Sequence, residues 1–272
     1  MARAGPSNVS SEVPMDDLGT TNKLLNLLGD EDAARFRPFL QRVELPLRSV
    51  LQEPGSPIRH IHFFERGIAS VIAASGHEEI EVGLLGNEAM SGLQVLSGLA
   101  TSSHKVLVQI PASALRIERE NFLDLIERCN EARDLFLKFR ECFAIQVEQT
   151  ALANGRYNIE PRLARWLLMC QDRLGEDEIR ITHETLALML GVRRAGVTTA
   201  LHVLEGDRLI KATRGTVVIR DRAALQAIAG ESYGLPEAAY KTIVENGVVA
   251  GAKDVPSPTI HSSAGRHQPA MH

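Results

Sequence analysis

Two adjacent arginines, Arg193 and Arg194, begin a segment over residues 192–204 that contains no acidic residue. A guanidinium forms paired hydrogen bonds with phosphate oxygens or with O6 and N7 of guanine. A helix that carries short side chains behind such arginines fits the DNA major groove. In a helix, one side of this segment would present Ala195, Thr198, Thr199 and His202. The segment is therefore a candidate DNA-reading helix.

A shorter helix is predicted immediately before this segment. Thr182 is a suitable N-cap, and Glu184 lies in the first turn, where an acid interacts favourably with the helix dipole. Gly191 is expected to end the helix, because glycine adopts a positive φ at little cost. The backbone N–H groups at Thr182 and His183 are then placed to meet a phosphate. The apolar side of this helix consists of Leu186, Met189 and Leu190.

A β-hairpin is predicted directly after the candidate reading helix. Its two β-prone runs, residues 209–211 and 217–219, flank the turn Arg214-Gly215. Two helices around a glycine are common in all-α proteins, but a hairpin after them indicates the winged form of the helix-turn-helix. Arg214 is either a DNA contact or a solvated side chain. The wing residues expected at the DNA backbone are Lys211, Arg214 and Thr216.

Residues 43–117 show a different pattern, in which short apolar runs are separated by turn residues such as Gly67. Strands at this spacing predict an antiparallel barrel or sandwich. His60 and His62 alternate on one of these strands, and no third ligand stands at metal spacing. We therefore interpret them as surface or structural histidines, and no metal site is expected. Short helices are expected between residues 23 and 40.

The longest helical pattern covers residues 121–152, and Asn154-Gly155 is expected to break it and to act as a hinge. Its apolar stripe fits a helix that packs on its own sheet, or a seam between two copies of the helix. The stripe is wide enough to serve both surfaces, which favours the dimer. The predicted seam consists of Leu135, Phe136, Phe139, Phe143 and Val147.

Trp166 is the only tryptophan, and it lies in the apolar stripe of the next predicted helix, after Pro161. It is therefore interpreted as a core residue rather than a platform for stacked bases. Residues 221–229 predict a closing helix, and residues 233–249 favour one further helix. Residues 1–20 and 250–272 are polar and without periodicity, so disorder is expected there.

Composition limits the class of protein further. The 272 residues are 44% hydrophobic and 24% charged, which is typical of soluble proteins, and no apolar run or signal peptide points to a membrane. The net charge of −4 conceals an asymmetry: residues 1–154 carry 15 Lys and Arg against 21 Asp and Glu, whereas residues 155–222 carry 12 against 9. The only positive segment is therefore the one with the candidate reading helix.

The three cysteines are isolated and expected to be buried in a reducing cytoplasm.

The C-terminal third resembles the DNA-binding domain of the cyclic-AMP receptor/fumarate-nitrate regulator (Crp/Fnr) superfamily. The residues that carry the resemblance are Ile181-Thr182, Gly191, Arg194, Val197, Leu201, Leu204-Glu205 and Leu209-Ile210. A looser likeness extends over residues 24–230. The resemblance implies an α+β protein with an N-terminal β-roll of the cyclic-nucleotide-binding type, a long dimerisation helix and a C-terminal winged helix-turn-helix domain.

Domain boundaries follow from this resemblance. They are a disordered tail (1–22), a β-roll sensor-like domain (23–120), a dimerisation helix (121–153), a winged helix-turn-helix domain (154–230) and a largely disordered C-terminal extension (231–272). By position and resemblance, Arg193 is assigned to phosphate and Arg194 to a base edge. The implied partners are double-stranded DNA, a second copy of the chain and RNA polymerase.

The effector pocket of the family would lie between Gly86 and Lys105, and its key charges are missing. Ser91-Gly92 stands where cyclic-nucleotide binders place Gly-Glu, and Ser102-Ser103 stands where they place Arg-Ser. A buried cyclic phosphate without a cation is unfavourable, so a response to cyclic nucleotides is not expected. Residues 1–40 contain no cysteine for an iron–sulfur sensor, and no cofactor is expected. The degenerate pocket would comprise Gly86, Ser91, Gly92, Leu93, Ser102 and Ser103.

Two functional hypotheses follow. The first is a dimeric, sequence-specific DNA-binding transcription regulator in the cytoplasm with a degenerate sensor domain. The alternative is an effector-binding module whose helix-turn-helix serves protein contacts. An enzyme is not expected, because the sequence has no Gly-rich phosphate loop, GxSxG or HExxH motif.

Overall fold

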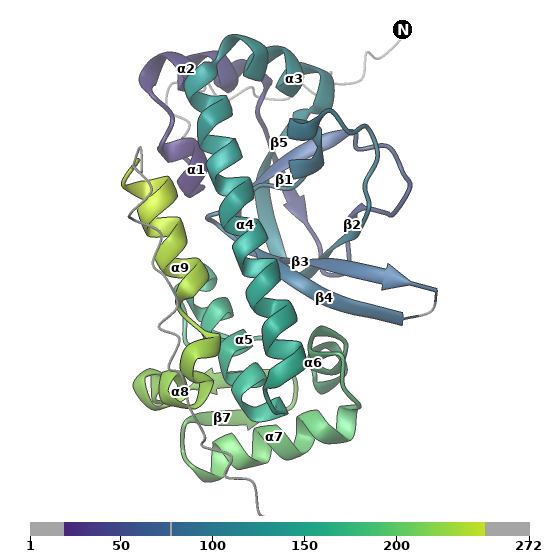
Figure 1. The fold of residues 1–272 in the computed structure, drawn as a ribbon, viewed down its shortest axis with the longest axis vertical. Coiled ribbons are helices and arrows are strands. Elements are labelled where there is room, and N and C mark those ends of the chain that lie inside the picture. The colour runs from purple at the N-terminus through teal and green to yellow at the C-terminus, as the bar shows by residue number, and fades with distance from the viewer. Residues whose placement is uncertain (1–18, 77, 248–272) are drawn as a thin grey trace, which may run out of the picture.

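The computed structural model describes residues 19–76 and 78–247. Residues 1–18 of the predicted N-terminal tail and residues 248–272 of the predicted extension lie outside the described residues. Within the described part, a β-roll lies on one side of a long helix and a winged helix-turn-helix domain lies below both (Figure 1). The predicted α+β architecture is confirmed.

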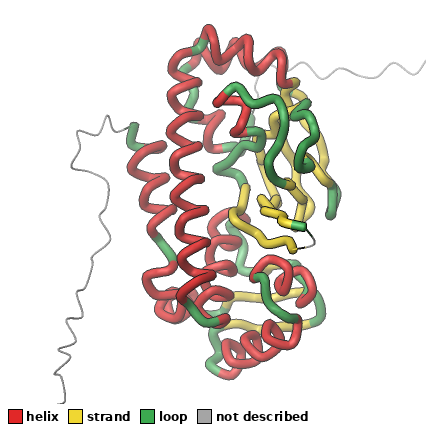
Figure 2. The backbone as a smooth tube through the Cα atoms, turned by 45° about the vertical axis from the view of Figure 1, so that its right-hand side comes forward, coloured by secondary structure: helices red, strands yellow, loops and turns green. Residues whose placement is uncertain are grey.

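The β-roll is an antiparallel five-stranded sheet with the order β1-β5-β3-β4, in which β2 also pairs with β5. Its strands are β1 (Gln41–Leu45), β2 (Val50–Gln52), β3 (His60–Ser75), β4 (Glu78–Leu85) and β5 (Lys105–Glu118). The 3-10 helix η2 (Leu93–Ser97) lies between β4 and β5. Figure 2 shows this sheet beside the helical part of the molecule.

The turn expected at Gly67 is wrong, because β3 passes through this residue as one strand of 16 residues. Gly67 has a φ of 77°, and the pairing of β3 with β5 shifts register on both sides of it. An added Cβ would lie 2.3 Å from the carbonyl oxygen of Pro111. The glycine therefore forms a bulge against β5 rather than a reversal of the chain.

Short helices precede the sheet, as expected, and they help to close its core. They are α1 (Lys23–Asn26), α2 (Asp30–Phe36) and η1 (Arg37–Phe39). Phe36 packs edge-on against Phe122 and Phe136, with ring centroids 6.3 and 5.9 Å apart. Phe63 from β3 lies 5.5 Å from Phe136. These four aromatic rings join the sheet to the helices.

Two helices, α3 (Arg119–Arg128) and α4 (Asn130–Arg156), replace the single helix predicted over residues 121–152. The chain bends at Cys129, which has φ −112° and ψ 83°. Asp32 from α2 accepts a hydrogen bond from the backbone N–H of Ala132, 100 residues away, at 3.1 Å. This contact satisfies an N–H group in the first turn of α4 and stabilises the new helix start.

The helix break expected at Asn154-Gly155 lies slightly later, because α4 continues to Arg156 and the backbone becomes extended at Tyr157. Ala153 is buried on this last turn, and its carbonyl accepts the N–H of Tyr157 at 3.0 Å. A glycine in a helix costs about 1 kcal/mol relative to alanine, and packing at neighbouring positions offsets this.

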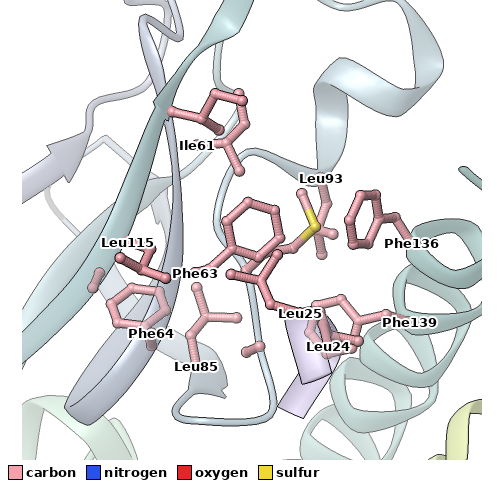
Figure 3. Close-up of a cluster of buried hydrophobic side chains, with 14 of the residues drawn as sticks. Leu24, Leu25, Ile61, Phe63, Phe64, Leu85, Leu93, Leu115, Phe136 and Phe139 are labelled. Atoms are coloured by element: carbon pink, nitrogen blue, oxygen red, sulfur yellow. The ribbon is translucent and has the colours of Figure 1, made fainter. Parts of the chain in front are cut away.

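The predicted dimer seam lies largely inside the protomer. Phe136 is 0% exposed and Phe139 is 3% exposed, and both point into the core of the β-roll (Figure 3). Leu135 and Phe143 pack against the same core. Of the predicted seam, only half-buried Val147 stays outside this core. The stripe is therefore explained by packing within one chain.

The C-terminal part is built around a second hydrophobic core, which it shares with Ile68, Ile72 and Leu84 of the β-roll. It comprises α5 (Ile159–Leu174), β6 (Glu178–Ile179), α6 (His183–Leu190), α7 (Arg194–Gly206), β7 (Ile210–Thr213), β8 (Thr216–Ile219) and α8 (Arg222–Ala229). Trp166 is buried in this core, as expected. The small sheet has the order β6-β8-β7.

The extension after residue 230 is helical as far as it is described, in agreement with the further helix favoured over residues 233–249. It comprises η3 (Gly230–Ser232), α9 (Leu235–Tyr240) and the π-helical turn η4 (Lys241–Glu245). The ring of Tyr240 packs edge-on against Phe139 at 6.3 Å, so α9 lies along α4. Figure 1 shows α9 and the β-roll on opposite sides of α4.

Cys129, Cys142 and Cys170 are free and buried. Among the residues with described positions, no helix is long and apolar enough to cross a membrane. No group of three or more His, Cys, Asp or Glu side chains in that part is arranged to hold a metal ion.

Replacing Phe136 with alanine should lower the free energy of unfolding by about 3–5 kcal/mol, because the change leaves a cavity at the centre of the aromatic cluster. Leu152 on α4 is 48% exposed and provides the control, for which alanine should cost less than about 0.5 kcal/mol. Urea unfolding of both variants measures the difference. Equal, small effects would contradict the assignment of Phe136 to the core.

Candidate DNA-binding interface

The helix-turn-helix is built by α6, a tight turn and α7. Thr182 caps α6, and its hydroxyl accepts the N–H of Thr185 at 3.2 Å. Gly191 ends α6 with φ 59° and ψ 40°, a conformation that glycine adopts without strain. Arg193 then stands at the N-cap of α7. The local signals in the sequence therefore determine this part of the fold.

Most of the predicted reading positions form one exposed row on α7. Its exposed members are Arg193, Arg194, Ala195, Thr199 and His202. The opposite side of α7 is buried in the domain core through Val197, Leu201 and Leu204. Burial of that side fixes the rotation of the helix, so the row faces outward.

Thr198 has a second role that the sequence did not indicate. A ring nitrogen of His183, Nδ1, lies 3.0 Å from the Thr198 hydroxyl, which links the start of α6 to α7. The Thr198 hydroxyl also donates to the carbonyl of Arg194 at 3.2 Å, and Thr199 donates to Ala195 at the same distance. With its proton donated to Arg194, the Thr198 oxygen accepts from His183 Nδ1–H, and the oxygen of exposed Thr199 remains as an acceptor.

The wing is held against the helices by backbone contacts. Ile181 N–H donates to the carbonyl of Gly215 at 3.0 Å, which joins the wing turn to the start of α6. Glu205 at the end of α7 accepts the N–H of Ala212 at 3.1 Å. Lys211 and Arg214 are exposed, and Thr216 is half-buried on β8. The wing and α7 thus form one rigid unit.

The cations of this surface are not neutralised by neighbouring acids. None of the ion pairs formed by the residues described includes Arg193, Arg194, Lys211 or Arg214. Two arginines that the sequence did not single out lie at the edges of the unit. Arg162 donates to the carbonyl of Leu190 at the end of α6. Exposed Arg180 lies beside Thr182 and pairs with Glu178 at 3.2 Å.

In the region that corresponds by sequence to the effector pocket, most of the predicted residues contact other side chains of the β-roll. Ser102 is buried and contacts Gln94 and Gln52 at 3.1 and 3.3 Å. Ser91 accepts the N–H of His62 at 3.1 Å. The Gly92 backbone lies against Ile61, which an added Cβ would approach to 3.1 Å. Leu93 is buried, and Ser103 is exposed.

Gly86 lies apart from this region, because an added Cβ there would come within 2.6 Å of Arg173 on α5. Histidines near the pocket do not supply a positive charge at neutral pH. Burial, with His60 and Arg116 nearby, lowers the pKa of His62 to about 3, and burial also lowers the pKa of His104. Lys105 pairs with Glu79 at 3.0 Å, so its charge is already engaged outside the pocket.

The C-terminal part matches a known family, and most of the chain matches known folds. Residues 161–228 match the Crp-like helix-turn-helix domain. A protein from Eubacterium rectale assigned to the Crp/Fnr family of transcriptional regulators is 18% identical, with a TM-score of 0.59, over 77% of this chain and 98% of that one. No curated protein matches this sequence.

Two further solved structures show the same fold. The c-di-GMP-responsive global regulator CLP of Xanthomonas campestris is 20% identical, with a TM-score of 0.57, over 70% of this chain and 99% of that one. A CRP-family transcriptional regulator from Thermus thermophilus is 18% identical, with a TM-score of 0.55, over 71% of this chain and 98% of that one.

The chain therefore has the fold of the Crp/Fnr transcriptional regulators, and its residues 161–228 are a Crp-like helix-turn-helix domain.

Proposed function

We propose that this protein is a dimeric, sequence-specific DNA-binding transcription regulator of the cytoplasm that does not respond to cyclic nucleotides. The observation that carries this proposal is the exposed row on α7, with two arginines at its start and no acid between residues 192 and 204. Phosphate attracts such a surface without regard to sequence, and base edges add specificity. RNA polymerase is a partner implied by the resemblance alone.

The two arginines have different roles in this proposal. Arg194 is the first residue of α7, so its side chain reaches a guanine edge when the N-terminal end of the helix enters the major groove. Arg193 is the N-cap residue, and it is assigned to the phosphate backbone. Ala195 offers only an apolar contact, for example to a thymine methyl group. Lys211 and Arg214 on the wing add phosphate contacts.

A dimer is proposed through the side of α4 that the β-roll and α9 leave uncovered. Leu137, Ala144 and Ala151 are spaced seven residues apart on this side, and Val147 lies beside them. Leu137, Ala144 and Val147 are half-buried in the single chain, and Ala151 is exposed. A seven-residue apolar repeat is the pattern of a coiled-coil seam, in which small alanines permit close approach. A dimer would place two reading helices on successive half-sites.

Arg194→Ala should weaken binding to a genomic operator by about 1–3 kcal/mol per half-site and relax preference at one symmetric base pair. Arg193→Ala, its matched control, should weaken all sequences alike and lower the salt slope by about one per subunit. Gel shifts on operators with single-base changes measure both. If wild type retards no genomic fragment, the helix-turn-helix serves protein contacts instead, and the DNA-binding proposal is wrong.

Cyclic AMP and cyclic GMP should neither bind nor change DNA affinity, because Ser91, Ser102 and their neighbours fill the pocket without a cation. Isothermal calorimetry on the full chain checks this expectation. A dissociation constant below about 100 μM, or about 5.5 kcal/mol of binding free energy, would show that the pocket opens and accepts the phosphate.

Ala144→Arg should convert the dimer to a monomer without a large loss of thermal stability, because the charge enters the seam and not the protomer core. Ala227→Arg, on the exposed surface of α8, is the matched control and should stay dimeric. Sedimentation velocity at micromolar protein measures both. A monomeric wild type, or a dimeric Ala144→Arg variant, would rule out this seam.

A further inference from the structure

The β-roll meets the helix-turn-helix domain through β3, which contacts α5, and through β4, which contacts α6. At the start of β4, Ile80 lies against the turn of the helix-turn-helix, so that a Cβ on Gly191 would come within 2.7 Å of it. Further along, Gly83 lies against Phe143 of α4, which an added Cβ would approach to 2.7 Å. The β3–β4 hairpin accordingly sits directly above α6 (Figures 1 and 2).

Glu81 is a carboxylate buried in the middle of this contact and is 5% exposed. Its Oε1 accepts a hydrogen bond from Nε1 of Trp166 on α5 at 2.8 Å. Its Oε2 is hydrogen-bonded to the hydroxyl of Ser70 on β3. The Ser70 hydroxyl also lies 3.2 Å from Sδ of Met189 on α6. One chain of contacts thus runs from α5 through the β-roll to the first helix of the helix-turn-helix.

No ion pair of the described chain neutralises Glu81. The charged groups nearest to it are Arg165 and Arg173 on α5, and both are engaged elsewhere. Arg165 donates to the carbonyl of Ser232 at 2.8 Å and to the Thr150 hydroxyl at 3.1 Å. Arg173 pairs with Glu88 at 2.8 Å. The contacts from β3 and α6, Ser70 and Met189, carry no titratable group.

The remaining titratable neighbour is Cys170 on α5, whose pKa burial raises well above its usual value, so that it stays neutral. Burial raises the pKa of Glu81 to about 7, although the hydrogen bonds from Ser70 and Trp166 and the two arginines oppose this. Because the docked state binds the proton more tightly than a solvated glutamate does, docking is most favourable at low pH. This advantage is lost as pH rises through about 7.

The proton also determines the direction of the hydrogen bonds. When Glu81 is ionised, both carboxylate oxygens accept, and the Ser70 O–H must point to Glu81 and away from Met189. When Glu81 is neutral, its O–H donates to the Ser70 oxygen, and the Ser70 O–H is free to donate to the sulfur of Met189. Thioether sulfur is a weak acceptor, so this contact orients α6 more than it stabilises it.

We propose that Glu81 is a proton-linked positioning residue that couples the docking of the β-roll onto the helix-turn-helix domain to pH through Trp166, Ser70 and Met189. The proton comes from solvent, and no bond other than O–H forms or breaks. A single linked proton changes the docking equilibrium by at most about tenfold per pH unit. The coupling lies at the domain interface and goes beyond the proposed DNA binding.

The test uses the single tryptophan of the chain as a reporter. The indole N–H resonance of ¹⁵N-tryptophan-labelled full-length protein should shift between pH 5.5 and 8.5 with one midpoint near 7. Glu81→Gln preserves the acceptor for Trp166 and the donor for Ser70, so it mimics the protonated state and should abolish the shift. Glu79→Gln, two residues away on the same strand and paired with Lys105, is the matched control and should retain it.

Persistence of the shift in Glu81→Gln, or its absence in wild type, would overturn the proposal. DNA affinity provides a second readout: wild type should vary with pH, and Glu81→Gln should vary less and stay near the wild-type acidic limit. Histidines of the DNA surface are common to both proteins, so their effect cancels in this comparison. Equal pH dependence of DNA affinity in wild type and Glu81→Gln would show that protonation of Glu81 does not affect the helix-turn-helix. If no DNA is bound at all, the proposed function fails, and the indole titration still decides whether Glu81 takes up a proton at the domain interface.

Discussion

The packing of Phe136 and Phe139 into the core of the β-roll fixes the rotation of α4 about its axis. With these rings buried, Tyr240 of α9 packs against Phe139, and Leu137 and Ala144 on another side of α4 are half-buried. β4 then crosses α4 and reaches α6 at Gly191, which orients the helix-turn-helix relative to the β-roll. One aromatic cluster therefore fixes the orientation of α4 relative to the β-roll and α9.

Local signals made the helix-turn-helix predictable. The Thr182 cap, the positive φ of Gly191 and the apolar repeat through Leu201 act within a few residues, so their effects are visible in the sequence. The strands of the β-roll and the hairpin after α7 were predictable for the same reason. The helical spacing of the apolar residues in α7 predicted the row of exposed side chains. The hydrogen bond between His183 and Thr198 could not be predicted in this way.

Features set by distant residues could not be predicted in this way. The helix break at Cys129 depends on Asp32, and the period of α4 revealed an apolar stripe without revealing what covers it. The seam was therefore placed on Phe136 and Phe139, which the β-roll and α9 bury. Similarly, Glu81 and Trp166 are separated by 85 residues, and only the fold brings the carboxylate to the indole. A buried acid is expensive unless it is hydrogen-bonded or neutral, so its place at a domain boundary is informative.

Selection of genomic DNA fragments by the purified full-length protein, followed by sequencing of those retained, tests the central claim most directly. If α7 reads DNA in a dimer, the enriched fragments should share a two-fold symmetric sequence, with half-sites about 34–36 Å apart and one conserved guanine in each. Loss of that guanine preference with Arg194→Ala would tie it to α7. Recovery of fragments with no shared sequence, or of none above background, would contradict sequence-specific DNA binding through α7.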